Sequence, residues 1–77
     1  MSARHDVVEI RLRLPPAEIA YVKFVFESYE GIAVVRTLDR HAAVIELLVA
    51  PDFQAEAEAI LADLRHQVAW ERVEQPD

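Results

Sequence analysis

The sequence predicts an α+β domain in which the elements follow the order strand, helix, strand, strand, helix, strand. Some segments alternate apolar and polar residues as half-buried strands do, and two others repeat apolar residues at helical spacing. Turn-forming residues separate these segments. With 77 residues and no cysteine, we expect one domain over residues 1–77 without disulfides, and flexible tails at about 1–5 and 75–77.

The first half of the chain is predicted to hold one strand and one helix. Residues 7–14 alternate between apolar and charged side chains, which is typical of a strand with one face in the core. Pro15 and Pro16 end this strand and begin a helix over residues 17–30, because proline is tolerated in a first helical turn. Gly31, the only glycine, is expected to end the helix in the left-handed conformation.

The second half begins with a predicted hairpin and repeats the pattern. Pro51 and Asp52 break the third strand, and Asp52 is a suitable N-cap for the helix that follows. The predicted elements are strands at 32–38 and 42–49 joined by a turn at 39–41, a helix from 53 to about 66, and a strand at 68–73.

This βαββαβ order is the ferredoxin-like plan, a sandwich of a sheet and a helical layer. Right-handed crossovers then place the four strands in the antiparallel order 4-1-3-2, with both helices on one face.

The first helix carries more apolar surface than a position on a sheet requires. Its apolar residues span roughly 220° of the helix, whereas those of the second helix span roughly 100°. Tyr21 and Phe24 lie in the surplus arc. Either they pack against the second helix and the helix edges, or they form a subunit interface, as exposed apolar patches often do.

The open face of the predicted sheet is a second candidate interface. The third strand directs Val44, Glu46 and Leu48 outward. The second strand directs outward either Ile32, Val34 and Arg36 or the residues that alternate with them. Arg11 or Arg13 of the first strand can lie opposite Glu46 as a cross-strand ion pair. This face is either solvated or the contact of a dimer. The candidate interface residues from both surfaces, together with the aromatic residue of the last strand, are Tyr21, Phe24, Val34, Val44, Leu48 and Trp70.

The C-terminal end of the first helix breaks a local electrostatic rule. Glu27 and Glu30 lie where the helix dipole disfavours anions, and Lys23 precedes Glu27 in the less favourable order for an ion pair. Arg36, just beyond the turn, could neutralise them. We therefore predict a polar cluster of these four residues, which is either a solvated face or a binding site.

Composition argues against several classes of function. The net charge of −6 disfavours a nucleic-acid partner, and no apolar run approaches the length of a membrane span. The three histidines, His5, His41 and His66, do not converge at metal-ligand spacing, and neither serine stands in a nucleophile motif. We therefore expect no catalytic, cofactor or metal residues, regard an enzyme as the weaker class, and expect a soluble cytoplasmic protein.

Two resemblances add to this prediction. Residues 21–39 with Tyr29-Glu30-Gly31, followed by residues 46–53, resemble a family of short bacterial proteins catalogued only as a domain of unknown function. The overall pattern also resembles the ACT domains, which bind amino acids and build interfaces. ACT domains carry a glycine in the loop after the first strand, where this chain has Pro15 and Pro16, so the resemblance implies an interface more than an amino-acid site.

The function that these observations favour is a self-associating module, expected to be a homodimer, that mediates interactions or senses a small ligand. The alternative is a small dimeric enzyme of the α+β-barrel type, with its site between the sheet and the helices.

Overall fold

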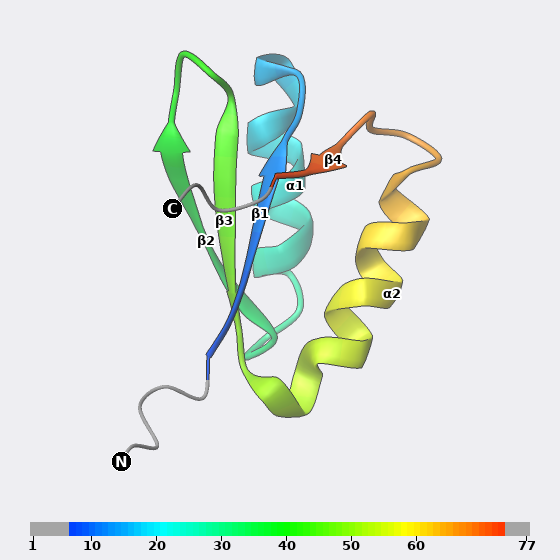
Figure 1. Cartoon of the computed structure of the whole chain (residues 1–77). Helices are drawn as coiled ribbons and strands as arrows, with labels where there is room; N and C mark the ends of the chain where they lie inside the picture. The colour runs from blue at the N-terminus through cyan, green and yellow to red at the C-terminus, as the bar shows by residue number, and fades with distance from the viewer. Residues whose placement is uncertain (1–6, 74–77) are drawn as a thin grey trace.

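The computed structural model describes residues 7–73, and its elements follow the predicted order (Figure 1). The predicted flexible tails, at about 1–5 and 75–77, lie outside the described residues. The elements are β1 (Val8–Arg13), η2 (Pro16–Glu18), α1 (Ile19–Glu27), β2 (Ala33–Asp39), β3 (Val44–Val49), η3 (Pro51–Phe53), α2 (Gln54–Leu64) and β4 (Glu71–Arg72), where η denotes a short 3-10 helix.

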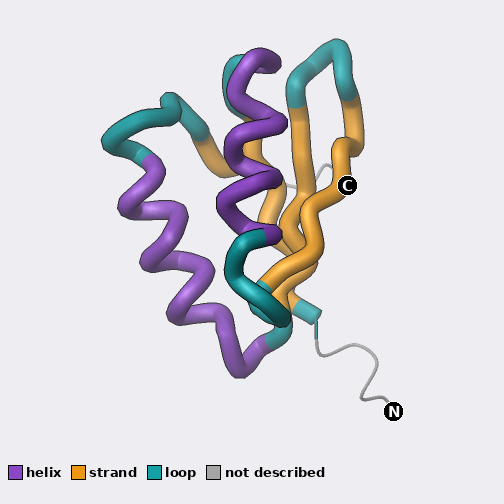
Figure 2. The backbone as a smooth tube through the Cα atoms, turned by 180° about the vertical axis from the view of Figure 1, so that it is seen from behind, coloured by secondary structure: helices purple, strands orange, loops and turns teal. Residues whose placement is uncertain are grey.

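The four strands form one antiparallel sheet in the order β2-β3-β1-β4, which confirms the predicted ferredoxin-like topology. β3 lies between β1 and β2 and pairs with both of them. Both helices lie on the same side of the sheet, as the view from behind shows (Figure 2). The opposite side of the sheet is left open by the described part of the chain.

The hydrophobic core lies between the sheet and the two helices. The predicted alternation is confirmed in β1 and β3, whose alternate residues Ile10, Leu12, Ile45, Leu47 and Val49 are all buried. α1 contributes two buried side chains, and α2 contributes three. The helical members of this core are Val22, Phe26, Ala57, Leu61 and Leu64.

Both helices begin later than predicted because a proline-led 3-10 turn comes before each of them. The predicted N-cap at Asp52 is wrong: Phe53 occupies the N-cap position of α2, and no side chain caps it. Pro51 starts the 3-10 turn, and the Phe53 N–H donates to the carbonyl of Ala50 at 2.8 Å instead. Phe53, where the second helix was predicted to begin, belongs to this turn and is exposed.

The last strand is shorter than predicted, because the segment before it is held by α2. The Trp70 indole N–H donates to the Leu61 carbonyl at 2.9 Å, and the Arg65 guanidinium lies 3.7 Å from the centre of the Trp70 ring. Trp70 is therefore a packing residue, only 6% exposed. Only Glu71 and Arg72 pair with β1.

The hairpin between β2 and β3 turns at residues 40–43, slightly later than the predicted 39–41. The Asp39 carboxylate accepts hydrogen bonds from the backbone N–H groups of His41 and Ala42, at 2.9 and 3.0 Å. This Asx-type turn stabilises the tight connection. The register shifts between Thr37 and Asp39, so the pairing of β2 with β3 is irregular next to the turn.

Gly31 adopts the predicted left-handed conformation, with φ of +80°. It does not end the helix as predicted, because α1 ends at Glu27 with Ser28 as its C-cap and Gly31 lies in the turn that follows. A Cβ atom at this position would meet nothing within 4 Å, so the position requires glycine for its backbone and not for lack of space. We expect Gly31→Ala to lower the free energy of unfolding by about 1 kcal/mol, because alanine is strained at positive φ.

Gly31→Asn is the matched control, since asparagine tolerates this conformation better than alanine. We expect it to destabilise the protein less than Gly31→Ala does in urea unfolding followed by circular dichroism. An asparagine variant that is less stable than the alanine variant would contradict this explanation.

Candidate functional site

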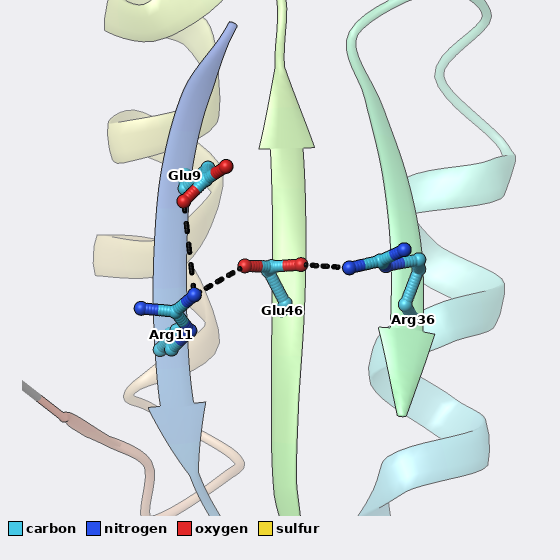
Figure 3. Close-up of polar contacts among 4 residues, drawn as sticks. All are labelled: Glu9, Arg11, Arg36 and Glu46. Carbon is cyan, nitrogen blue, oxygen red and sulfur yellow. Dashed lines mark hydrogen bonds and ion pairs between the residues drawn. The ribbon is translucent and has the colours of Figure 1, made fainter. Parts of the chain in front are cut away.

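A row of charged side chains crosses the open face of the sheet. Glu46 on β3 lies between Arg11 on β1 and Arg36 on β2, and it is the register partner of both (Figure 3). One carboxylate oxygen, Oε2, is 3.0 Å from a guanidinium nitrogen of Arg11, and the other, Oε1, accepts a hydrogen bond of 2.7 Å from Arg36. Glu9 lies 3.7 Å from Arg11 and extends the row.

Glu46 is only 1% exposed, although no secondary-structure element of the described chain covers this face. The flanking side chains cover its carboxylate, and both of its oxygens are bound by cations. A buried carboxylate is tolerated when it is paired and hydrogen-bonded in this way. The four charges of the row, two positive and two negative, sum to zero. The row is therefore neutralised within the chain itself.

The same face is apolar beside the charged row. Val34 on β2 is 61% exposed and is the register partner of the half-buried Leu48 on β3. Around these two residues lies a shallow hollow of about 440 Å³. Its lining consists of Val7, Gly31, Ile32, Ala33, Val34, Leu48 and Ala50. On the other side of the row, Val44 is half buried. The open face thus combines an internally paired charged row with apolar surface.

A second surface feature is a groove between α1 and α2 on the helical side, with a volume of about 450 Å³. Tyr21 and Phe24 of α1 lie on one side, and Ile60 and Asp63 of α2 lie on the other. The Tyr21 hydroxyl donates a 2.5 Å hydrogen bond to Oε1 of Gln67, which links the two sides of the groove.

The structure separates Arg36 from the acidic end of the first helix. Arg36 lies on the open face and pairs with Glu46, whereas α1 lies on the other side of the sheet. None of the ion pairs among residues 7–73 includes Lys23, Glu27 or Glu30. The predicted four-residue cluster is therefore not formed: β2 was left without an assigned face in the sequence, and its register places Arg36 opposite Glu46.

The predicted interface residues divide between three environments. Tyr21 and Phe24 line the helical groove, and Phe24 is 67% exposed. Val34, Val44 and Leu48 lie on the open sheet face together with the Glu46 row. Trp70 is buried within its own domain and offers little surface to a partner.

Two further properties considered in the sequence are metal binding and membrane insertion. Within residues 7–73, no group of three or more His, Cys, Asp or Glu side chains is arranged to hold a metal ion. None of the helices in this part of the chain is long and apolar enough to cross a membrane.

The comparison with protein families identifies a family for this chain. Residues 12–68 match the model of the family described as domain of unknown function DUF4911, which covers most of the chain from β1 to the end of the α2 region. The chain belongs to this family. The resemblance to a domain of unknown function is thus confirmed. Comparisons of this DUF4911 domain with curated proteins and with solved structures gave no significant match.

Sequence reasoning found part of the candidate surfaces in this DUF4911 domain. The pairing of Arg11 with Glu46 was one of its two predicted alternatives, and the register selects it. It missed Arg36 as the second partner of Glu46. It also missed the groove, whose only signal in the sequence was the excess of apolar residues around α1.

Proposed function

We propose that this DUF4911 domain is a self-associating module, a homodimer whose contact surface is the open face of its sheet. The observation that carries the proposal is the nearly complete burial of Glu46 between Arg11 and Arg36 on a face that no other element covers. The ACT-like pattern of the sequence supports the same kind of role, since such domains build interfaces through this fold.

The pairing of charges lowers the cost of covering this face. An isolated charge loses much hydration energy on burial, but each cation in the row already has a carboxylate partner. Arg36 is the most exposed of the three side chains in the Glu46 pairings. A second copy that covers the row would therefore strengthen existing ion pairs without leaving a new charge unpaired.

The apolar residues supply the driving force for association. Val34 is exposed and lies beside the hollow that Leu48 and Gly31 help to line. Each Å² of such apolar surface that is removed from water stabilises the complex by about 25 cal/mol. In a two-fold symmetric contact each residue is present in both copies. A substitution of one exposed valine therefore changes the free energy of association twice, which it would not do in a heterodimer.

The test compares two exposed apolar residues on opposite sides of the molecule. Val34→Gln changes the open face, and Phe24→Gln changes the helical groove, while neither variant alters a charge. We expect Val34→Gln to weaken dimerisation about tenfold or more, and Phe24→Gln to leave it unchanged, as measured by sedimentation velocity over a concentration series.

Two results would overturn this proposal. One is a wild-type chain that stays monomeric up to about 100 μM, a concentration at which a micromolar dimer is mostly assembled. The other is loss of the dimer in Phe24→Gln but not in Val34→Gln, which would place the contact on the helical side.

A further inference from the structure

The groove between α1 and α2 concentrates the exposed aromatic side chains of the domain. Four aromatic residues are exposed among residues 7–73, and three of them, Tyr21, Phe24 and Tyr29, line this groove. Exposed aromatic rings are costly in water unless a ligand or partner covers them. Their gathering in one concave place indicates a binding site, separate from the proposed dimer contact on the open sheet face.

The charge of the groove selects the kind of ligand. Asp63 is its one ionisable carboxylate, and its lining contains no lysine, arginine or histidine. Asp63 takes part in none of the ion pairs found within residues 7–73. An anion would find no cationic side chain in this lining, whereas a cation would find a carboxylate as well as aromatic faces, which attract cations.

The hydroxyl groups of the groove add to this preference. The Ser28 hydroxyl donates to the carbonyl of Val25 at 2.6 Å, and the Tyr21 hydroxyl donates to Gln67. The protons of these two hydroxyls are thereby used inside the protein, which leaves their oxygen lone pairs as acceptors. Such oxygens suit a ligand that donates hydrogen bonds, as an ammonium group does.

We propose that this groove binds a small organic cation, in which an ammonium group is carried on an apolar body. The ammonium group lies near Asp63, and the apolar body packs against the aromatic side chains. The volume of about 450 Å³ falls within the range of roughly 300–1,000 Å³ that is usual for small-molecule sites. The net charge of −6 favours the approach of such a ligand to the domain.

The experiment uses three probes that share one aromatic body and differ in charge. Phenethylamine is a cation at pH 7, 2-phenylethanol is neutral, and 3-phenylpropanoate is an anion. Each is titrated into the ¹⁵N-labelled full chain while amide shifts are followed by NMR. We expect phenethylamine to shift the amides of α1 and α2 around the groove and to bind about tenfold more tightly than 2-phenylethanol. The anion is expected to bind most weakly.

Matched variants locate the charge that acts. Asp63→Asn removes the groove carboxylate, and Glu27→Gln removes an exposed carboxylate of α1 that does not line the groove. We expect Asp63→Asn to weaken phenethylamine binding about three- to fivefold and Glu27→Gln to leave it unchanged. Both side chains are exposed, so the spectra of the variants will show that the fold is kept.

Several results would overturn the proposal. Equal affinities for the three probes would show that the groove does not select ligands by charge. An equal effect of the two variants would show that the overall negative charge of the domain, and not Asp63, attracts the cation. The absence of shifts up to about 10 mM phenethylamine would exclude even a millimolar site. Shifts in the groove that depend on protein concentration alone would mean that a second copy fills it. All of these readouts are independent of whether Val34→Gln changes the oligomeric state.

Discussion

Replacement of Phe26 by alanine is expected to lower the free energy of unfolding by about 3–5 kcal/mol. The Phe26 side chain is fully buried, with 0% exposure, where α1 packs on the sheet. Its truncation removes a large apolar group from the core and leaves a cavity. Because domains are stable by only about 5–15 kcal/mol, and short chains lie toward the lower end, we expect much of the stability to be lost.

Phe24→Ala is the matched control, because this phenylalanine belongs to the same helix and is exposed. We expect it to change the free energy of unfolding by no more than about 0.5 kcal/mol. Both variants are measured at one protein concentration by urea unfolding followed by circular dichroism. Similar losses in the two variants would show that α1 does not pack as the structure has it.

Replacement of Glu46 by alanine is the second large effect that we expect, a loss of about 2 kcal/mol. Without the carboxylate, the guanidinium groups of Arg11 and Arg36 face one another across β3 with no anion between them. Removal of one partner from a fully buried ion pair costs about 3–5 kcal/mol. The loss is smaller here because the side chain of Arg36 is more than half exposed and can be hydrated.

Glu71→Ala tests whether burial is the cause of this effect. Glu71 also pairs with an arginine of β1, Arg13, at 3.3 Å, but both of these side chains are more than half exposed. Exposed ion pairs contribute about 0–1 kcal/mol, so we expect a loss of that order in the same unfolding measurement. If the alanine variants at 46 and 71 were equally stable, the Glu46 row would be an ordinary surface pairing.

The order of elements and the faces of two strands could be predicted from the sequence because they depend on local patterns. Alternation fixes which side of β1 and β3 enters the core, and it places Glu46 on the open face. The left-handed turn at Gly31 likewise follows from the residue itself. These features require no knowledge of how distant segments meet.

Features that depend on distant segments were predicted only in part. The side of β2 that faces the core was not assigned, because Val34 and Val35 lie on opposite sides of this strand. A shift of one residue in its pairing would exchange the two sides. Arg36 was therefore assigned to the acidic end of α1 and not to Glu46. The groove between the helices depends on how far apart α1 and α2 lie, which no periodicity within one helix can specify.

The position of β2 at the edge of the sheet also bears on whether further copies of this chain could add to it strand by strand. β2 has seven residues and pairs on one side only, with β3, within the described part of the chain. Such an edge offers backbone groups that can template the addition of further strands and lead to fibres. The shifted register between Thr37 and Asp39 and the charge of Arg36 both disfavour regular strand addition there. In the homodimer that we propose, contact through the face of the sheet, with the edge protected in this way, would give a closed pair without open-ended polymerisation.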